Sequence, residues 1–251
     1  MNNKKTYDIF VFCCGKSGST TLEYSLQNKG YSVLHVHSKE HYDCVYKKNH
    51  VSDYGKNHTI FDVIEESMKQ KEKVYIFDSY RTPLERKISA FFHHIESGEK
   101  LLPNYKNLTN KQIQTFFNNK HLQIIEGYTS CNYLFKYFDI KGFTKYIPDS
   151  QYQICNYKNI VFVKMYFENI KIWDNLLTKI MGKEITLLCG QYSSKKEYYK
   201  RYKEFLKFYK VPKKYLLEVI QNDHEFHKFV SPQKRIEYIN KWLLRTCNDN
   251  F

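Results

Sequence analysis

The sequence predicts an α/β protein with a central, mainly parallel sheet flanked by helices and with a helical C-terminal part. Near-continuous apolar runs at 7–14, 73–79 and 159–167 are typical of strands buried on both faces. Segments with helical periodicity lie between these runs, and this alternation favours a parallel sheet wrapped by helices. From about residue 193 onward, the pattern indicates helices with an excess of basic residues.

The first predicted elements are a strand at 7–14, a short loop and a helix from about 20 to 29. Gly30 follows that helix, at the position where a left-handed glycine commonly ends one. The stretch at 31–37 alternates and is rich in β-formers, so we expect it to be the second strand.

The helix expected at 58–70 has an apolar face made of Ile60, Val63, Ile64 and Met68. The run at 73–79 after it is predicted to be a buried strand. The start of the next helix is well marked, because Thr82 suits the N-cap and Pro83 suits the first helical position. Glu85 completes a Thr-x-x-Glu capping box there.

The C-terminal half adds a strand at 159–167, a helix at 170–182 closed by Gly182, and a basic helical region. Residues 195–214 hold nine Lys or Arg residues against two Glu residues. We find no linker, no low-complexity segment and no internal repeat. The prediction is therefore a single domain, 1–251, with the helical basic region at about 193–251 packed on it.

The composition narrows the class of protein. A net charge of +14 implies a partner or substrate with negative charge. The seven cysteines include no Cys-x-x-Cys pair, which indicates reduced thiols in a cytosol-like compartment. The apolar run near the N-terminus is too short for a signal peptide or a membrane span. We therefore expect a soluble, cytoplasmic protein, and the sequence leaves its oligomeric state open.

The stretch "FVFCCGKSGSTTLEYSL", residues 10–26, places a glycine-rich loop between the first strand and the first helix. Such a loop presents backbone N–H groups at the positive end of a helix and predicts an anion site. The Walker A loop that binds ATP would need a glycine where this chain has Phe10, so that loop is not formed. The shorter loop can wrap one terminal phosphate with backbone N–H groups, hydroxyls and one ammonium, supplied by Lys16, Ser17, Gly18, Ser19, Thr20 and Thr21.

A second candidate anion site follows the strand at 73–79. Arg81 leaves the carboxyl end of that strand, where open α/β sheets bind their ligands. Arg86 and Ser89 share one face of the following helix, and Ser89 can share an anion with Arg81. An ordinary surface helix is the alternative interpretation.

Together, "KSGSTT" and "RTPLERKISAFF" resemble the two nucleotide-binding signatures of sulfotransferases that use 3′-phosphoadenosine-5′-phosphosulfate (PAPS). The resemblance implies that the loop at 16–21, with Lys16, grips the 5′-phosphosulfate. It implies that Arg81 and Ser89 grip the 3′-phosphate, which distinguishes PAPS from ATP. It also implies a P-loop-type three-layer fold, adenosine 3′,5′-bisphosphate (PAP) as the nucleotide product, and no metal.

Other stretches, "GYSVLHVH", "FVKMYFENIKIW" and "KFVSPQKRIEYINKWL", look like the capsular polysaccharide synthesis family of sulfotransferase-like proteins. That resemblance implies an enzyme that sulfates a hydroxyl of a carbohydrate or glycan, and a tyrosine or small-molecule acceptor stays open. The glycine-rich C-terminal segment that covers the nucleotide in small-molecule cytosolic sulfotransferases is not visible in this sequence, so the lid is unassigned.

Sulfuryl transfer needs a base for the acceptor hydroxyl, and histidine suits this role near neutral pH. In related sulfotransferases the base precedes the 3′-phosphate arginine by a little over twenty residues. His58, which lies 23 residues before Arg81, is therefore the first choice. His37 and His35, which share one face of the predicted second strand, are the alternatives. A zinc site that also includes His41 lacks a supporting thiolate pair or His-x-x-x-His helix, so we expect no metal.

Two other functions compete with the sulfotransferase prediction. A nucleotide-dependent kinase would need a carboxylate for Mg²⁺, and Asp78 is the only tempting one at a strand end. A non-catalytic protein could bind a polyanion or nucleic acid through the Lys- and Tyr-rich segment at 193–214. A solvated amphipathic helix explains that segment better, so we do not expect a nucleic-acid partner.

Overall fold

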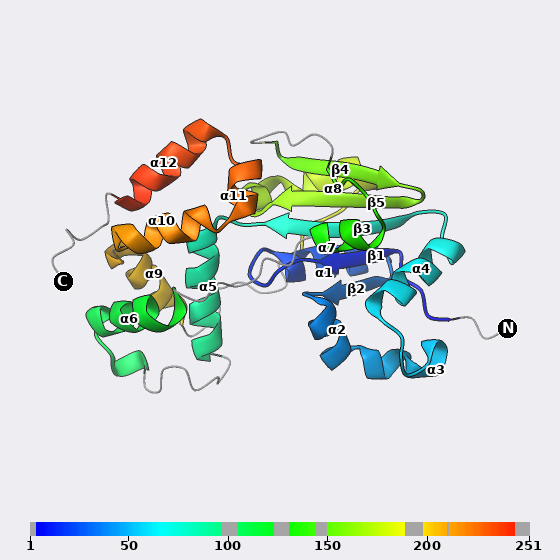
Figure 1. Cartoon of the computed structure of the whole chain (residues 1–251), viewed down its shortest axis with the longest axis horizontal. Coiled ribbons are helices and arrows are strands. Elements are labelled where there is room, and N and C mark those ends of the chain that lie inside the picture. The colour runs from blue at the N-terminus through cyan, green and yellow to red at the C-terminus, as the bar shows by residue number, and fades with distance from the viewer. Residues whose placement is uncertain are drawn as a thin grey trace. The chain divides into compact units, whose positions relative to one another are not determined.

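The computed structural model describes most of the chain, namely residues 4–96, 105–122, 131–143, 150–188, 198–209 and 211–243 (Figure 1). The chain divides into two compact units, each formed by two separate stretches. Unit 1 consists of Met1–Tyr80 and Tyr128–Gly190, and unit 2 consists of Arg81–Gly127 and Gln191–Phe251. Each unit is formed by two stretches of the chain that are separated in sequence. The single domain at 1–251 stays a prediction.

Unit 1 is built on a five-stranded sheet with the order β2-β1-β3-β5-β4. The strands are β1 (Ile9–Phe12), β2 (Val33–Val36), β3 (Val74–Tyr80), β4 (Tyr152–Tyr157) and β5 (Ile160–Tyr166). All neighbours run parallel except β4 and β5, which are antiparallel. The predicted mainly parallel sheet is therefore confirmed, whereas the sequence analysis did not predict β4.

Helices flank this sheet on both faces. On one face, Val11 and Phe77 of the sheet pack in a buried core with Leu22 and Trp173. Leu22 belongs to α1 (Ser19–Asn28) and Trp173 begins α8 (Trp173–Met181). On the other face, α7 (Asn132–Tyr137) crosses the sheet in Figure 1, and its Phe135 ring lies 4.8 Å from the ring of Phe162 in β5.

The connection between β2 and β3 carries three helices, α2 (Lys39–Val45), α3 (Val51–Tyr54) and α4 (Ile60–Gln70), and a 3₁₀ turn (Lys47–His50). The sequence predicted α4, which begins with a capping box made by Thr59 and Asp62. It did not predict α2 and α3. Gly30 and Gly182 adopt positive φ angles after α1 and α8, as expected for glycines that end helices.

Every regular element described in unit 2 is helical. They are α5 (Pro83–Glu96), α6 (Asn110–Phe116), a π-helical turn (Phe117–His121), α9 (Tyr199–Phe208), α10 (Lys213–Gln221), α11 (His224–Phe229), α12 (Pro232–Leu243) and a 3₁₀ turn (Tyr105–Asn107). The predicted helical C-terminal part is confirmed for these residues, and 193–197 lie outside the described residues. The described part of the predicted basic helical region contains two helices: α9 ends at Phe208, and α10 begins at Lys213, directly after Pro212, which has no backbone N–H to donate.

The predicted helix start at Pro83, after Thr82, is confirmed. The Thr82 hydroxyl donates to Glu85 over 2.9 Å, and the Arg86 N–H bonds the Thr82 carbonyl. Glu85 also accepts from the hydroxyl of Tyr238 and the ammonium of Lys241 on α12. Glu85, in the first turn of α5, therefore also links α5 to α12 within unit 2.

Candidate functional site

The candidate site is the loop that leaves the carboxyl end of β1 and enters α1. Two of its residues have left-handed backbone, Lys16 with φ 66° and Gly18 with φ 91°. A left-handed conformation is uncommon for a residue with a side chain, and lysine there points to a loop shaped by its surroundings. Successive N–H groups in such alternating conformations form concave anion-binding surfaces.

Gly18 is fixed by the packing of Trp173 against it. A Cβ atom at position 18 would lie 2.8 Å from Trp173 and 3.1 Å from Phe167, which is closer than side chains tolerate. The Trp173 indole is buried and donates to the Tyr166 carbonyl over 2.9 Å, so its ring is held in place. The glycine that the sequence analysis singled out is thus required both by its backbone angle and by its neighbours.

Ser17 secures the loop to the sheet. Its buried hydroxyl donates to the Cys14 carbonyl over 2.7 Å, and the Ser79 hydroxyl lies 2.8 Å from both the Ser17 hydroxyl and carbonyl oxygens. The side chain of Ser17, which we expected to bind phosphate, is therefore committed to the loop itself. Ser79 on β3 was missed because its partner lies 62 residues away.

The start of α1 offers backbone donors. The first hydrogen bond within the helix runs from the Leu22 N–H to the Gly18 carbonyl. The N–H groups of residues 19–21 consequently have no acceptor within the helix, and the helix dipole adds positive potential there. Ser19 and Thr21 are buried, whereas Thr20 is half-buried. Of these three hydroxyl residues in the first turn of α1, Thr20 is therefore the most exposed.

The two alternative bases predicted on the second strand lie beside this loop. The Nδ1–H of His37 donates to the Cys13 carbonyl over 2.8 Å, directly before the loop begins. Because a carbonyl only accepts, neutral His37 carries its lone pair on Nε2. The His35 and His37 rings are 4.6 Å apart, and the His37 and His41 rings are 4.8 Å apart.

His35 has a carboxylate partner that the sequence analysis did not identify. Its Nδ1 lies 2.7 Å from Oε2 of Glu23 on α1. No local sequence signal connects the two residues, because the contact depends on how α1 packs over β2. Burial, together with the neighbouring histidines His35 and His41, lowers the pKa of His37 to about 4, although the Cys13 carbonyl and Glu23 act in the opposite direction. His37 is therefore neutral at physiological pH.

The structure does not bring His58 to the loop. Its Nδ1–H donates to the Gly55 carbonyl, so its Nε2 accepts from the Tyr42 hydroxyl over 2.8 Å. Tyr42 in turn lies 2.9 Å from Nδ1 of His50, whose Nε2 lies 2.8 Å from the Tyr7 hydroxyl. Tyr7 precedes β1, and the loop follows the opposite end of that strand, about 20 Å away at 3.3 Å per residue.

This chain of hydrogen bonds bears on the prediction that His58 is the base. Both ring nitrogens of His58 are occupied by structural partners in a buried position. His58 lies 23 residues before Arg81 in the chain, and its hydrogen bonds lead through Tyr42 and His50 to Tyr7, which precedes β1. The alternatives that the sequence offered, His37 and His35, lie beside the loop.

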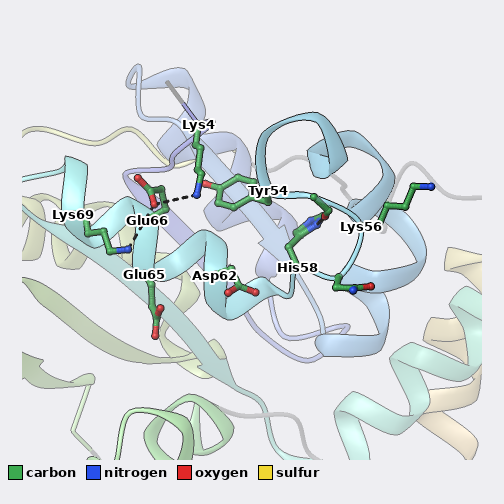
Figure 2. Close-up of a pocket in the computed structure, with 10 residues that line it drawn as sticks. Lys4, Tyr54, Lys56, His58, Asp62, Glu65, Glu66 and Lys69 are labelled. Carbon is green, nitrogen blue, oxygen red and sulfur yellow. Dashed lines mark hydrogen bonds and ion pairs between the residues drawn. The ribbon is translucent and has the colours of Figure 1, made fainter. Parts of the chain in front are cut away.

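His58 lines a polar cavity of about 460 Å³ in unit 1 (Figure 2). Figure 2 shows Glu66 between two ammonium groups, with Lys4 at 3.7 Å and Lys69 at 3.8 Å. Asp62, which also faces this space, accepts from the Thr59 N–H and hydroxyl. The charged lining is thus largely paired within the protein, and the cavity lies toward the amino end of β1, away from the loop.

Asp78, the carboxylate considered for Mg²⁺, has structural partners. It is fully buried, its Oδ2 lies 3.0 Å from the ammonium of the equally buried Lys164, and it accepts from the Cys131 N–H over 3.2 Å. A buried ion pair of this kind is costly to break. Asp78 therefore serves β3, β5 and the start of α7.

Arg81 and Ser89 belong to unit 2. Arg81 follows β3 in the chain and precedes α5, and Ser89 lies on α5 one turn after Glu85. Arg81 is half-buried, Arg86 is buried, and both have interactions within the protein. Their assignment to a 3′-phosphate stays a prediction from the sequence resemblance.

Three further observations concern predictions about metals, cysteines and membranes. In the described stretches, no group of three or more His, Cys, Asp or Glu side chains is arranged to hold a metal ion. Five of the seven cysteines are described and are free thiols, while Cys189 and Cys247 lie outside the described residues. Within the same part of the chain, no helix combines the length and apolar character needed to cross a membrane.

Comparison with known protein families, with curated proteins and with solved structures finds no match to this chain. A function is therefore inferred from the loop and its neighbouring histidines.

Proposed function

We propose that this protein is a PAPS-dependent sulfotransferase with a P-loop-type three-layer fold, which transfers a sulfuryl group to an acceptor hydroxyl. The observation that carries the proposal is the short loop between β1 and α1. It combines left-handed backbone at Lys16 and Gly18, the start of a ten-residue helix, and a neutral imidazole anchored to the residue before the loop. An anion-binding loop beside a base is the minimum that sulfuryl transfer requires.

The loop would hold the 5′-phosphosulfate of the co-substrate. The N–H groups at the start of α1 are preorganised donors for phosphate oxygens, and the Lys16 ammonium supplies a positive charge. The Thr20 hydroxyl is a further donor at the same turn. Ser17 and Gly18 contribute through the shape of the backbone, because the Ser17 hydroxyl is used inside the loop and Gly18 is confined by Trp173.

In the proposed reaction, His37 Nε2 takes the proton of the acceptor hydroxyl. The acceptor oxygen forms a bond to sulfur while the bond between sulfur and the bridging oxygen breaks. The electron pair of that bond stays on the bridging oxygen and produces PAP. Lys16 and the loop N–H groups stabilise the charge that accumulates on the bridging and phosphate oxygens. The reaction needs no metal ion.

A kinase is the weaker alternative on the same site. This chain has Phe10 where the Walker A loop of an ATP-binding kinase has a glycine. The carboxylate considered for Mg²⁺, Asp78, forms an ion pair with Lys164. The acceptor is proposed to be a carbohydrate hydroxyl on the strength of the sequence resemblance, and the net charge of +14 favours an acceptor with negative charge.

Turnover tests the chemistry. We expect the purified protein to convert PAPS to PAP only when an acceptor is added, in a panel of saccharides, phenols and small alcohols. His37→Ala should lower kcat by about 100-fold or more, which is the usual contribution of a general base, and should retain PAP binding. His224→Ala, at an exposed position on α11, is the matched control. Unchanged turnover in His37→Ala would remove His37 from the mechanism.

The 3′-phosphate assignment is tested by comparing PAP with adenosine 5′-phosphate. If Arg81 contacts the 3′-phosphate, the preference of the protein for PAP should shrink in Arg81→Ala by about tenfold or more. Affinity for adenosine 5′-phosphate should stay near that of the unmodified protein. An equal loss for both nucleotides would mean that Arg81 does not read the 3′-phosphate.

A further inference from the structure

Glu23, His35 and His37 form a continuous arrangement beside the loop. Glu23 lies on α1, one turn after Ser19, so it is about 6 Å along the helix axis from the donors of the loop. Its Oε2 lies 2.7 Å from His35 Nδ1, and the His35 ring stands edge-on to the His37 ring at 4.6 Å. The helix that starts the anion site thus also carries the carboxylate behind the histidines.

The partners fix the protonation pattern of both rings. A carboxylate accepts, so His35 donates its Nδ1–H to Glu23, and His37 donates its Nδ1–H to the Cys13 carbonyl. With both Nδ1 atoms committed, both neutral rings have their lone pairs on Nε2. Orientation of an imidazole through one nitrogen is the arrangement that leaves the other nitrogen free to accept a proton.

His35 Nε2 is buried and has no hydrogen-bond partner in the described part of the chain. An unsatisfied buried polar atom costs on the order of 1–3 kcal/mol, so such atoms are uncommon in folded proteins. An apolar side chain at this strand position would avoid that cost. Glu23 thus holds the His35 ring in an orientation that leaves His35 Nε2 without a hydrogen bond in the described part of the chain. This cost in stability points to a role for His35 other than stabilising the fold.

Several charged and polar groups near His37 affect how readily its ring takes up a proton, and Glu23 is one of them. The groups that face His37 are His35 on β2, His41 on α2, the Cys13 carbonyl at the end of β1, and Glu23 on α1. Burial opposes a positive charge on His37 most strongly, and the two neighbouring histidines add to this, whereas the Cys13 carbonyl and, to a smaller extent, Glu23 favour it. Glu23 is the carboxylate in this set, so its negative charge acts together with the Cys13 carbonyl to stabilise an imidazolium formed on His37.

We infer that Glu23 and His35 are positioning residues for His37. Glu23 orients the His35 ring, which packs against the His37 ring. The Glu23 carboxylate also stabilises the positive charge on His37 once His37 has taken the proton of the acceptor hydroxyl. This inference rests on the proposed function for its catalytic part. The coupling between Glu23 and the two rings is a property of the protein without substrate.

The test is Glu23→Gln, which keeps the size of the side chain and removes its charge. NMR titration of the histidine rings, without nucleotide, should show His37 protonating at lower pH than in the unmodified protein and should lose the N–H signal of His35 bonded to a carboxylate. The kcat with PAPS should fall severalfold, because a weaker base takes the acceptor proton less readily, with an unchanged KM for PAPS. Glu72→Gln, at an exposed position before β3, is the matched control and should change none of these.

The outcomes separate the two claims. If the unmodified protein neither binds PAP nor consumes PAPS, the proposed function fails, and the ring titration still decides the coupling. A Glu23→Gln protein whose His37 titrates as in the unmodified protein overturns the inference. If Glu23→Gln unfolds, Glu23→Asp measured in the same way supplies the result, because it keeps the charge but withdraws it from His35. His37 should then protonate at lower pH, and an unchanged His37 titration overturns the inference.

Discussion

Gly18 combines a positive φ angle with a neighbour that leaves no room for a Cβ atom. Gly18→Ala should therefore destabilise the protein by about 3 kcal/mol, the sum of a strained backbone and a clash with Trp173. Urea unfolding measures this effect. Gly15→Ala is the control in the same loop, because a Cβ there meets no atom within 4 Å, and it should change stability by less than about 1 kcal/mol. Equal effects of both changes would contradict the packing described for the loop.

The buried ion pair of Lys164 and Asp78 allows the free-energy cost of an unpaired buried charge to be measured. Lys164→Met removes the ammonium and leaves the Asp78 carboxylate buried, so stability should fall by about 3–5 kcal/mol. Lys136→Met, on the exposed side of α7, should have little effect. Asp78→Asn combined with Lys164→Met should recover part of the loss, since no unpaired charge then remains. A loss in the double variant equal to that of Lys164→Met would show that the charge is not the cause.

His37 should make stability depend on pH. Its pKa is about 4 in the folded protein against an ordinary value of 6.5, so the unfolded chain binds the proton more readily. Stability is therefore fully present above pH 6.5 and is lost as the pH falls toward 4. The contribution between pH 7.5 and pH 5 is about 2 kcal/mol.

Urea unfolding at pH 7.5 and pH 5 measures this dependence. His37→Gln should reduce the difference between the two pH values, while the exposed His224→Gln should leave it unchanged. Burial also lowers the pKa values of His41 and His50, so part of the dependence should persist in His37→Gln. A His37→Gln protein with the full dependence would contradict the environment described for this ring.

At the scale of the elements, the connection from β2 to β3 is held to β1 by a chain of buried hydrogen bonds. Tyr42→Phe removes the hydroxyl between His50 and His58 and should cost about 3 kcal/mol, because it leaves a buried nitrogen unsatisfied on each ring. Tyr24→Phe, exposed on α1, is the control. Nucleotide binding by folded Tyr42→Phe protein should be unchanged; a selective loss of binding would return the His58 region to the functional site.

Elements with a local signal could be predicted from the sequence. The apolar runs of β1, β3 and β5 and the capping residues of α5 are read within a few neighbouring residues. The strand β4 could not be predicted in the same way, since its exposed and half-buried alternation resembles a loop segment rich in polar residues. The helices α2 and α3 are only seven and four residues long, too short for a clear helical periodicity in the sequence.

The same distinction applies to the site. The loop was predictable because glycine, lysine and hydroxyl residues are adjacent in sequence. The contacts of Glu23 with His35 and of Ser17 with Ser79 were not predictable, because they join residues on different elements of the folded chain. The hydrogen bonds of His58 were not predictable for the same reason: a spacing along the chain does not say at which end of a sheet a residue lies.

At the scale of the whole molecule, the net charge of +14 suits either a small anionic nucleotide or a long polyanion as the ligand. Measuring ligand affinity at several salt concentrations distinguishes the two. A nucleotide held in a loop by a few groups should lose affinity modestly between 50 and 200 mM salt. A protein that binds a long polyanion through its basic helices should lose about a thousand-fold or more over this range. Parallel titrations with PAP and with a single-stranded oligonucleotide should show which ligand this protein retains at 200 mM salt, and we expect it to be PAP.

Calorimetric titration with PAP and with ATP–Mg²⁺ tests the central claim most directly. The unmodified protein should bind PAP more tightly than ATP–Mg²⁺. Lys16→Ala should weaken PAP binding by about 10- to 100-fold, the value of a charge-assisted hydrogen bond, while Lys29→Ala at the exposed end of α1 should not. Tighter binding of ATP–Mg²⁺, or PAP binding by Lys16→Ala equal to that of the unmodified protein, would contradict the assignment of this loop to a 5′-phosphosulfate.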